Sequence, residues 1–227
     1  MCLLAIETAT DVCSIALAES GRILAENTVY LPKRHSELLT RMIEQQLRNI
    51  QQDIDAIEGV AISIGPGSFT GLRIGLSTAK GLVYRQKTPL YAVPTLAASA
   101  WSVHRLTDRV GVLHHSHRSQ YFFAVYDLRQ GPELVTGPVR QDVQDICAGL
   151  DRELRLVVQA PPGQNPTGEI PNRILSLDCV RGTHLAELTL WNPDQWLVEE
   201  PYQLEPDYLK DYQAVKFKNP LKSEKGG

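Results

Sequence analysis

The stretch SIGPGSFTGLRIG, residues 63–75, places four glycines and a proline between an apolar run and a predicted helix. The run GVAISI (59–64) is continuous and apolar, which is typical of a buried parallel strand. A strand, a glycine-rich turn and a helix together present free backbone N–H groups at the positive end of a helix dipole, as a phosphate site requires. The same glycines also allow two segments of chain to pack closely. A phosphate site would indicate an ATP-using enzyme, whereas close packing would indicate an assembly partner.

Neither common phosphate-binding motif matches this loop. The Walker motif G-x-x-x-x-G-K-[ST] fails because Gly65 and Gly71 are one residue too far apart and Leu72-Arg73 replaces the Lys-Ser/Thr pair. The dinucleotide motif G-x-G-x-x-G fails because the third glycine comes one position late after Gly65 and Gly67. We therefore expect a tight turn that starts a packing helix and keeps the shape of a phosphate loop without its residues.

The helix predicted over residues 70–84 carries a ridge of small residues at four-residue steps, Gly71, Gly75 and Ala79. Such a ridge lets a second element approach closely, either in the core of the same chain or on a partner's helix. A second amphipathic helix is predicted over residues 36–50, with Ser36 as its N-cap. Apolar side chains run beside the ridge and along the second helix: Leu72, Leu76, Val83, Leu38, Leu39, Met42, Ile43 and Leu47.

The order of predicted elements indicates an α/β protein. Residues 2–30 form three strands joined by short turns, so they pair antiparallel, and the first 105 residues follow the order β-β-β-α-β-α-β-α. This order predicts a mixed sheet covered by helices. The second part is less regular, with strands at 110–117, 119–127, 133–140 and 154–160, helices at 143–150 and 183–190, and a surface loop at 161–172.

Composition excludes several classes of protein. The 227 residues carry a formal net charge of -3, so no general basic field attracts nucleic acid. No apolar run approaches the ~20 residues that cross a bilayer, and the first residues do not resemble a signal peptide. The four cysteines include no C-x-x-C pair, which is typical of isolated buried thiols in a reducing compartment. We expect a cytoplasmic protein.

Three stretches closely resemble the TsaB (YeaZ) family: LLAIETATDVCSIAL (3–17), HSELLTRMIEQQL (35–47) and GPGSFTGLRIGLSTAKGL (65–82). VPTLAASAW and EPDYLKDYQ fit the same family more loosely, and the likeness is weak over 105–205. The resemblance implies a two-subdomain actin-like, Hsp70-like fold of the ASKHA, ribonuclease H-like class, with mixed sheets flanked by helices. It predicts an N-terminal subdomain at 1–104, a smaller divergent subdomain at 105–206 and a C-terminal segment with a solvated tail at 207–227.

The resemblance implies a non-catalytic role in threonylcarbamoylation of adenosine 37 in tRNAs that read ANN codons. The chain is expected to be a homodimer alone and to bind and activate a TsaD-type paralogue, with a TsaE-type ATPase joining through the complex. It implies only indirect contact with tRNA, no membrane, no metal, and ATP or ADP with magnesium only in the complex. The alternative is a residual ATPase or a glycoprotease-like hydrolase, although neither Ser68 nor Cys13 has a histidine partner implied by spacing.

Site residues follow from the resemblance and the two apolar helices. The predicted partner-binding residues are Leu38, Leu39, Met42, Ile43, Leu72, Gly75, Leu76 and Ala79. A vestigial nucleotide site is predicted at Glu7, Thr8, Gly65, Gly67, Ser68 and Arg73. The carboxylate of Glu7 suits a magnesium-bound water or caps the backbone of its turn. Thr95 and Ser99 stand where the TsaD paralogue has its metal-binding histidines, and neither replaces imidazole at a metal.

One departure from the family lies in the second subdomain. Many TsaB sequences have Asp-Ala-Arg followed by Glu-Val-Tyr, whereas this chain has Ser116-His117-Arg118 and SQYFFAVY, which keep the arginine and lose both acids. Strand alternation places His115 and His117 on one face. Because no third ligand follows from the sequence, we expect His114, His115 and His117 to be surface histidines rather than a metal site.

Overall fold

The structure, a computed structural model, describes residues 1–160, 170–176 and 179–209. They form two compact units, of which the first comprises 1–102 with 179–208 and the second is built from 103–178. The predicted boundary falls after residue 104, with 105–206 assigned to the smaller subdomain. In the structure residues 179–206 group with the first unit. Most of the predicted 161–172 loop and of the C-terminal tail lies outside the described residues.

The first unit is built on a five-stranded mixed sheet in the order β3-β2-β1-β4-β5. The first three strands pair antiparallel, and β4 and β5 continue the sheet in parallel beside β1. This agrees with the antiparallel pairing of the first three strands and with the mixed sheet predicted from the sequence. Its strands are β1 (Cys2–Glu7), β2 (Val12–Glu19), β3 (Arg22–Tyr30), β4 (Gly59–Ser63) and β5 (Leu90–Val93).

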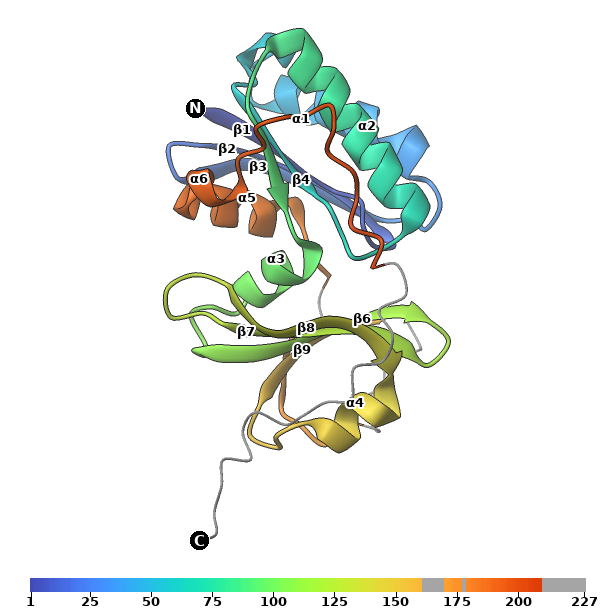
Figure 1. Ribbon diagram of the computed structural model, residues 1–227. Helices are drawn as coiled ribbons and strands as arrows, with labels where there is room; N and C mark the ends of the chain where they lie inside the picture. The colour runs from blue at the N-terminus through green and yellow to red at the C-terminus, as the bar shows by residue number, and fades with distance from the viewer. Residues whose placement is uncertain (161–169, 177–178, 210–227) are drawn as a thin grey trace, which may run out of the picture. The chain divides into compact units, whose positions relative to one another are not determined.

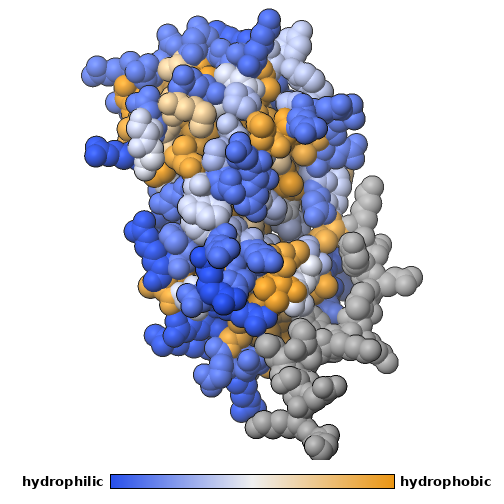
Figure 2. Space-filling model, turned by 60° about the vertical axis from the view of Figure 1, so that its left-hand side comes forward, coloured by the Kyte–Doolittle hydropathy of each residue, from blue (hydrophilic) through white to orange (hydrophobic). Residues whose placement is uncertain are grey.

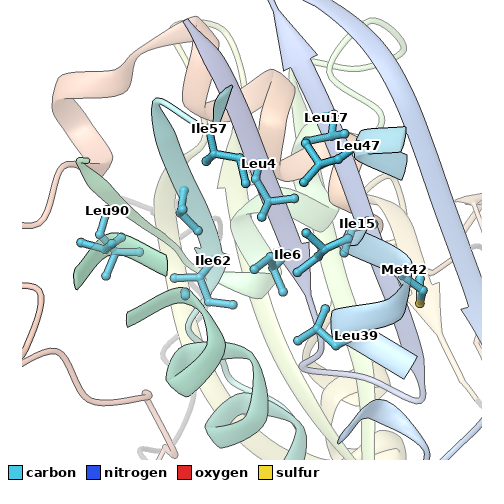
Figure 3. Packing of buried hydrophobic residues seen from close by; sticks show 14 of the residues in the cluster. Leu4, Ile6, Ile15, Leu17, Leu39, Met42, Leu47, Ile57, Ile62 and Leu90 are labelled. Carbon is cyan, nitrogen blue, oxygen red and sulfur yellow. The ribbon is translucent and has the colours of Figure 1, made fainter. Parts of the chain in front are cut away.

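Two helices, α1 (His35–Asn49) and α2 (Phe69–Gln86), cover one face of this sheet, and α5 (Gly182–Trp191) covers the other (Figure 1). Figure 3 shows the apolar core under α1 and α2, where Ile6 and Ile15 of the sheet meet Leu39 of α1. The predicted N-cap of α1 is wrong: the cap is Arg34, which makes no side-chain cap bond but pairs with Glu37. Three short helices complete the unit: η1 (Ile54–Ala56), α3 (Thr95–Trp101) and α6 (Pro193–Trp196).

The second unit repeats the topology of the first. Its sheet has the order β10-β9-β6-β7-β8, in which three strands pair antiparallel and two continue in parallel beside β6. One short helix, α4 (Val143–Gly149), packs on β7 and β8. Its strands are β6 (Arg109–His117), β7 (Gln120–Asp127), β8 (Glu133–Asp142), β9 (Arg155–Gln159) and β10 (Ile174–Ser176).

Candidate functional site

The turn between β1 and β2 contains a fully buried carboxyl group. Glu7 ends β1 with 0% of its surface exposed, and its Oε1 accepts a hydrogen bond of 2.7 Å from the backbone N–H of Ala9. Burial raises the pKa of Glu7 to about 7, against the opposing effect of hydrogen bonds from Ser63 and from the backbone N–H groups of Ala9 and Thr10. The hydrogen bond from Ala9 N is the contact that the turn-capping alternative requires.

The glycine loop packs directly against this turn. A Cβ on Gly67 would lie under 3.0 Å from the carbonyl oxygen of Ala9, and a Cβ on Gly71 equally close to that of Thr8. Gly75 approaches the Thr8 hydroxyl in the same way. These distances are shorter than real Cβ contacts, so the ridge exists to admit the turn of the same chain. At Gly71 and Gly75 the ridge therefore packs in the core of the same chain and not on a partner's helix.

Several N–H groups that a phosphate cradle needs are bonded within the chain. Ser68 N donates to the Ala9 carbonyl at 2.6 Å, and Gly65 N donates to Thr95 Oγ1 at 3.1 Å. Ser68 is the N-cap of α2, since its hydroxyl accepts from Gly71 N at 3.2 Å. These three donors are therefore used within the chain, as they would be in a tight turn that starts a packing helix.

Arg73, the remaining residue of the predicted nucleotide site, is engaged elsewhere. Its guanidinium carbon lies 3.9 Å from the centre of the Phe69 ring, and its Nε donates to the Tyr208 hydroxyl at 2.9 Å. The Phe69 and Tyr208 rings are themselves 4.8 Å apart. The structure therefore brings Glu7, Thr8, Gly67 and Ser68 together but holds Arg73 in an aromatic cluster.

The predicted partner-binding residues form part of the core. Leu72 and Ala79 are 0% exposed and Leu76 is 5% exposed. A charge placed at Leu76 would therefore enter the core rather than a surface. Among the predicted residues only Leu38 is partly exposed, whereas the others are buried: Leu39, Met42, Ile43, Leu72, Gly75, Leu76 and Ala79.

A different stripe of α2 faces outward. Its residues stand at alternating four- and three-residue steps, so they share one face of the helix. Gly81 is exposed in the middle of the helix, and no atom lies within 4 Å of the place where its Cβ would stand. We call this stripe the outer seam, and it comprises Thr70, Ile74, Ser77, Gly81 and Tyr84, of which Ile74 is half-buried against the core.

The C-terminal residues 197–208 run along α2 beside the outer seam, as Figure 1 shows for the red segment. Val198 N donates to Leu90 O at 2.9 Å, and Asp207 N donates to Ile64 O at 2.7 Å. Between them Lys80 Nζ of α2 donates to the carbonyl of Tyr202 at 2.9 Å. We call 197–208 the strap. Sequence reasoning missed it because no element pattern marks these residues.

The three histidines of β6 do not share one environment. His114 is 3% exposed, so the prediction of a surface residue is wrong there, and burial lowers its pKa to about 3. His115 and Arg118 are joined by a contact of 2.8 Å between Nε2 and the backbone carbonyl. The register shifts between His115 and His117, so the simple alternation that placed them on one face does not hold. Within the part of the chain that the structure describes, no three His, Cys, Asp or Glu side chains are grouped for a metal.

The surface is mainly polar on the face that Figure 2 shows, where apolar side chains form small separate groups. Within the described residues, no helix has the length and apolar character that crossing a membrane requires.

Two units that each carry a mixed five-stranded sheet of the same order define an actin-like α/β protein of the ASKHA class. A protein-family model described as TsaD, tRNA N6-adenosine threonylcarbamoyltransferase, matches residues 27–150, more than half of the chain. The chain belongs to this family and, within it, to the TsaB (YeaZ) group.

Individual relatives support the assignment. The tRNA threonylcarbamoyladenosine biosynthesis protein TsaB of Escherichia coli (strain K12) is 34% identical over 153 residues, which cover 67% of this chain and 61% of the relative. TsaB of Bacillus subtilis (strain 168) is 28% identical over 131 residues, 58% of this chain and 57% of the relative. The aligned region thus spans about three-fifths of the length of these relatives.

Solved structures agree on the fold. YeaZ from Pseudomonas aeruginosa superposes with a TM-score of 0.77 at 26% identity over 91% of this chain and 99% of that one. An activator of 2-hydroxyisocaproyl-CoA dehydratase from Clostridium difficile, at 11% identity and a TM-score of 0.54, covers 86% of this chain and 95% of that one and shares the fold alone.

Proposed function

We propose that this chain is a non-catalytic partner of a TsaD-type paralogue in threonylcarbamoylation of adenosine 37 of tRNA, and that it docks through the outer seam of α2. Family membership supports the pathway, since the relatives' names place them in threonylcarbamoyladenosine biosynthesis. A TsaE-type ATPase would join through the complex, and the chain alone would pair with a second copy through the same seam.

The observation that carries the docking site is Gly81. Glycine inside a helix costs about 0.5–1 kcal/mol relative to alanine, because the unfolded chain has more freedom to lose. Gly71 and Gly75 have a reason inside the chain, in the turn that they admit, but Gly81 faces open space. A helix from another molecule would use that space, and the spacing of the outer seam matches the ridges of helices that cross at about +20°.

The residues around Gly81 suit an interface between proteins. Tyr84, 73% exposed, continues the outer seam, and Tyr202 of the strap, 60% exposed, lies against it with ring centres 6.1 Å apart. Phe69 is 52% exposed beside the stacked Arg73. Aromatic and arginine side chains of this kind supply much of the binding energy at protein interfaces. The charged residues of the strap are all acidic, which favours a protein over RNA as the occupant: Glu199, Glu200, Glu205 and Asp207.

A tyrosine substitution tests the docking site. Gly81→Tyr should leave the fold intact, because nothing occupies that space, and should weaken association with the TsaD-type protein of the same cell at least about 10-fold. Gly149→Tyr is the matched control, since Gly149 is also an exposed helical glycine in open space. Light scattering after size exclusion measures both variants, alone and mixed with the paralogue.

Two outcomes distinguish a wrong docking site from a wrong partner role. If Gly81→Tyr associates as tightly as the wild type, the outer seam is not the interface. If the wild type ignores the paralogue and leaves the yield of modified adenosine in a reconstituted reaction unchanged, the partner role itself is wrong.

A further inference from the structure

The second unit contains a cavity of about 660 Å³ that the family assignment does not explain. Its apolar lining includes Val125 of β7 and the half-buried Leu150 and Leu154 after α4, while Phe123 lies fully buried beneath them. The segment 104–109 forms one wall. The volume lies within the range of small-molecule sites. The cavity exists because α4 ends at Gly149 and leaves this end of the sheet uncovered.

Arg109 lines the cavity, and its guanidinium group has one unused donor that is closed to solvent. Arg109 is the first residue of β6, and its Nε is buried without a hydrogen-bond partner among the residues that the structure describes. Its cross-strand neighbour is Asp127, but both oxygens of Asp127 accept from Arg129, at 2.6–3.1 Å. A buried donor without an acceptor is costly, so an acceptor on a bound ligand would stabilise this arrangement.

The balanced charges around the cavity disfavour a ligand that carries more than one negative charge. Arg105 and Arg155 add two guanidinium groups to that of Arg109, and the rim also carries Asp108, Asp151 and Glu153. The Nη1 group of Arg155 already donates to Leu106 O at 2.7 Å, which fixes it as part of the wall. With the two signs balanced, a phosphate dianion gains little, whereas one carboxylate pairs with the guanidinium fork of Arg109.

We infer that this cavity binds small monocarboxylates that have an apolar body, with the carboxylate on Arg109 and the body on Val125, Leu150 and Leu154. The site belongs to the second unit alone and does not depend on the proposed docking of α2.

The probe is 3-phenylpropionate, titrated by calorimetry into the full chain. The wild type should bind it at least about 10-fold more tightly than the neutral 3-phenylpropanamide or the cationic phenethylamine. Arg109→Met keeps the apolar stem and should lose at least about 10-fold in affinity. Arg152→Met is the matched control, because Arg152 is exposed and does not line the cavity, and it should bind as the wild type does.

A second variant covers the case in which Arg109→Met unfolds. Gly149→Phe places a ring at the rim, where no atom lies within 4 Å of the new Cβ, and should also abolish binding. Circular dichroism confirms that each variant is folded. The inference is overturned if the probe does not bind the wild type, if the amide binds equally well, or if folded Arg109→Met and Gly149→Phe both retain full affinity.

Discussion

Replacing Gly71 with alanine is expected to destabilise the first unit by about 2–3 kcal/mol. The new Cβ would lie under 3.0 Å from the carbonyl oxygen of Thr8. That atom belongs to the backbone of the turn after β1, so no side chain can rotate away to relieve the contact. Either α2 or the turn must move, and the hydrogen bonds that Ser68 makes on both sides of the loop would be disturbed.

The control for this prediction stands on the same helix. Gly81→Ala adds a methyl group to open space and should stabilise the unit by about 0.5–1 kcal/mol, because alanine loses less backbone entropy on folding. Urea unfolding followed by tryptophan fluorescence measures both, since Trp101, Trp191 and Trp196 are the chain's three tryptophans and all lie in the first unit. If the two substitutions change the free energy of unfolding equally, the close approach at Gly71 is wrong.

Glu7→Gln is expected to remove a pH dependence of stability between about pH 4.5 and pH 7. Burial raises the pKa of Glu7 from an ordinary 4.5 to about 7. In this window the unfolded chain has released the proton and the folded chain still holds it, so stability falls as pH rises and levels off above the folded pKa. The change is equivalent to about 3 kcal/mol across the window. Glutamine has no proton to release, so the variant lacks this slope.

The readout is the difference between wild type and variant at each pH. His114 contributes with the opposite sign, since burial lowers its pKa from 6.5 to about 3 and stability is lost as pH falls through that range. This contribution is common to both proteins and cancels in the difference. Glu44→Gln, which removes an exposed carboxyl group from α1, should leave the wild-type slope in place. Parallel curves for wild type and Glu7→Gln would show that Glu7 is ionised in the fold.

The first unit was largely predictable from the sequence. Turn residues separate β1, β2 and β3, and the change to a 3.6-residue period marks α1, so the element order follows from local patterns. The Ser36 cap could not be placed in this way. It sits inside the first turn of α1, and Arg34 takes the cap position without a side-chain bond.

The site was less predictable because burial depends on contacts far apart in the chain. The stripe of Leu72, Leu76 and Ala79 fits a core helix and an interface helix equally well in one dimension. Only the fold reveals that its apolar face is already covered, by β4 of the sheet, by the turn at Thr8 and by the strap. For the proposed outer seam, the available signal in the sequence was Gly81, because it stands within a predicted helix but off the small-residue ridge.

In the second unit one error comes from a shift of register and the other from burial in the sheet. Alternation along β6 fails at the irregularity between His115 and His117, and such a shift carries no sequence mark. The burial of His114 follows from its pairing with Phe122 in the middle of the sheet. For a polar residue in a strand, the apolar character of its neighbours predicts its burial better than its own polarity does.

The late arrival of α5 affects how the protein is made. Gly182 N donates to Ser14 Oγ at 2.9 Å across 168 residues, so α5 is translated long after the strands that it covers. At about 5–20 residues per second, a ribosome would take roughly 10–30 s to bridge that interval. During this time Leu3, Ala5 and Ala16, all fully buried in the finished protein, lack the helix that shields their face of the sheet. A nascent chain paused before residue 182 should therefore bind chaperones that recognise apolar strands, and one released after the strap should not.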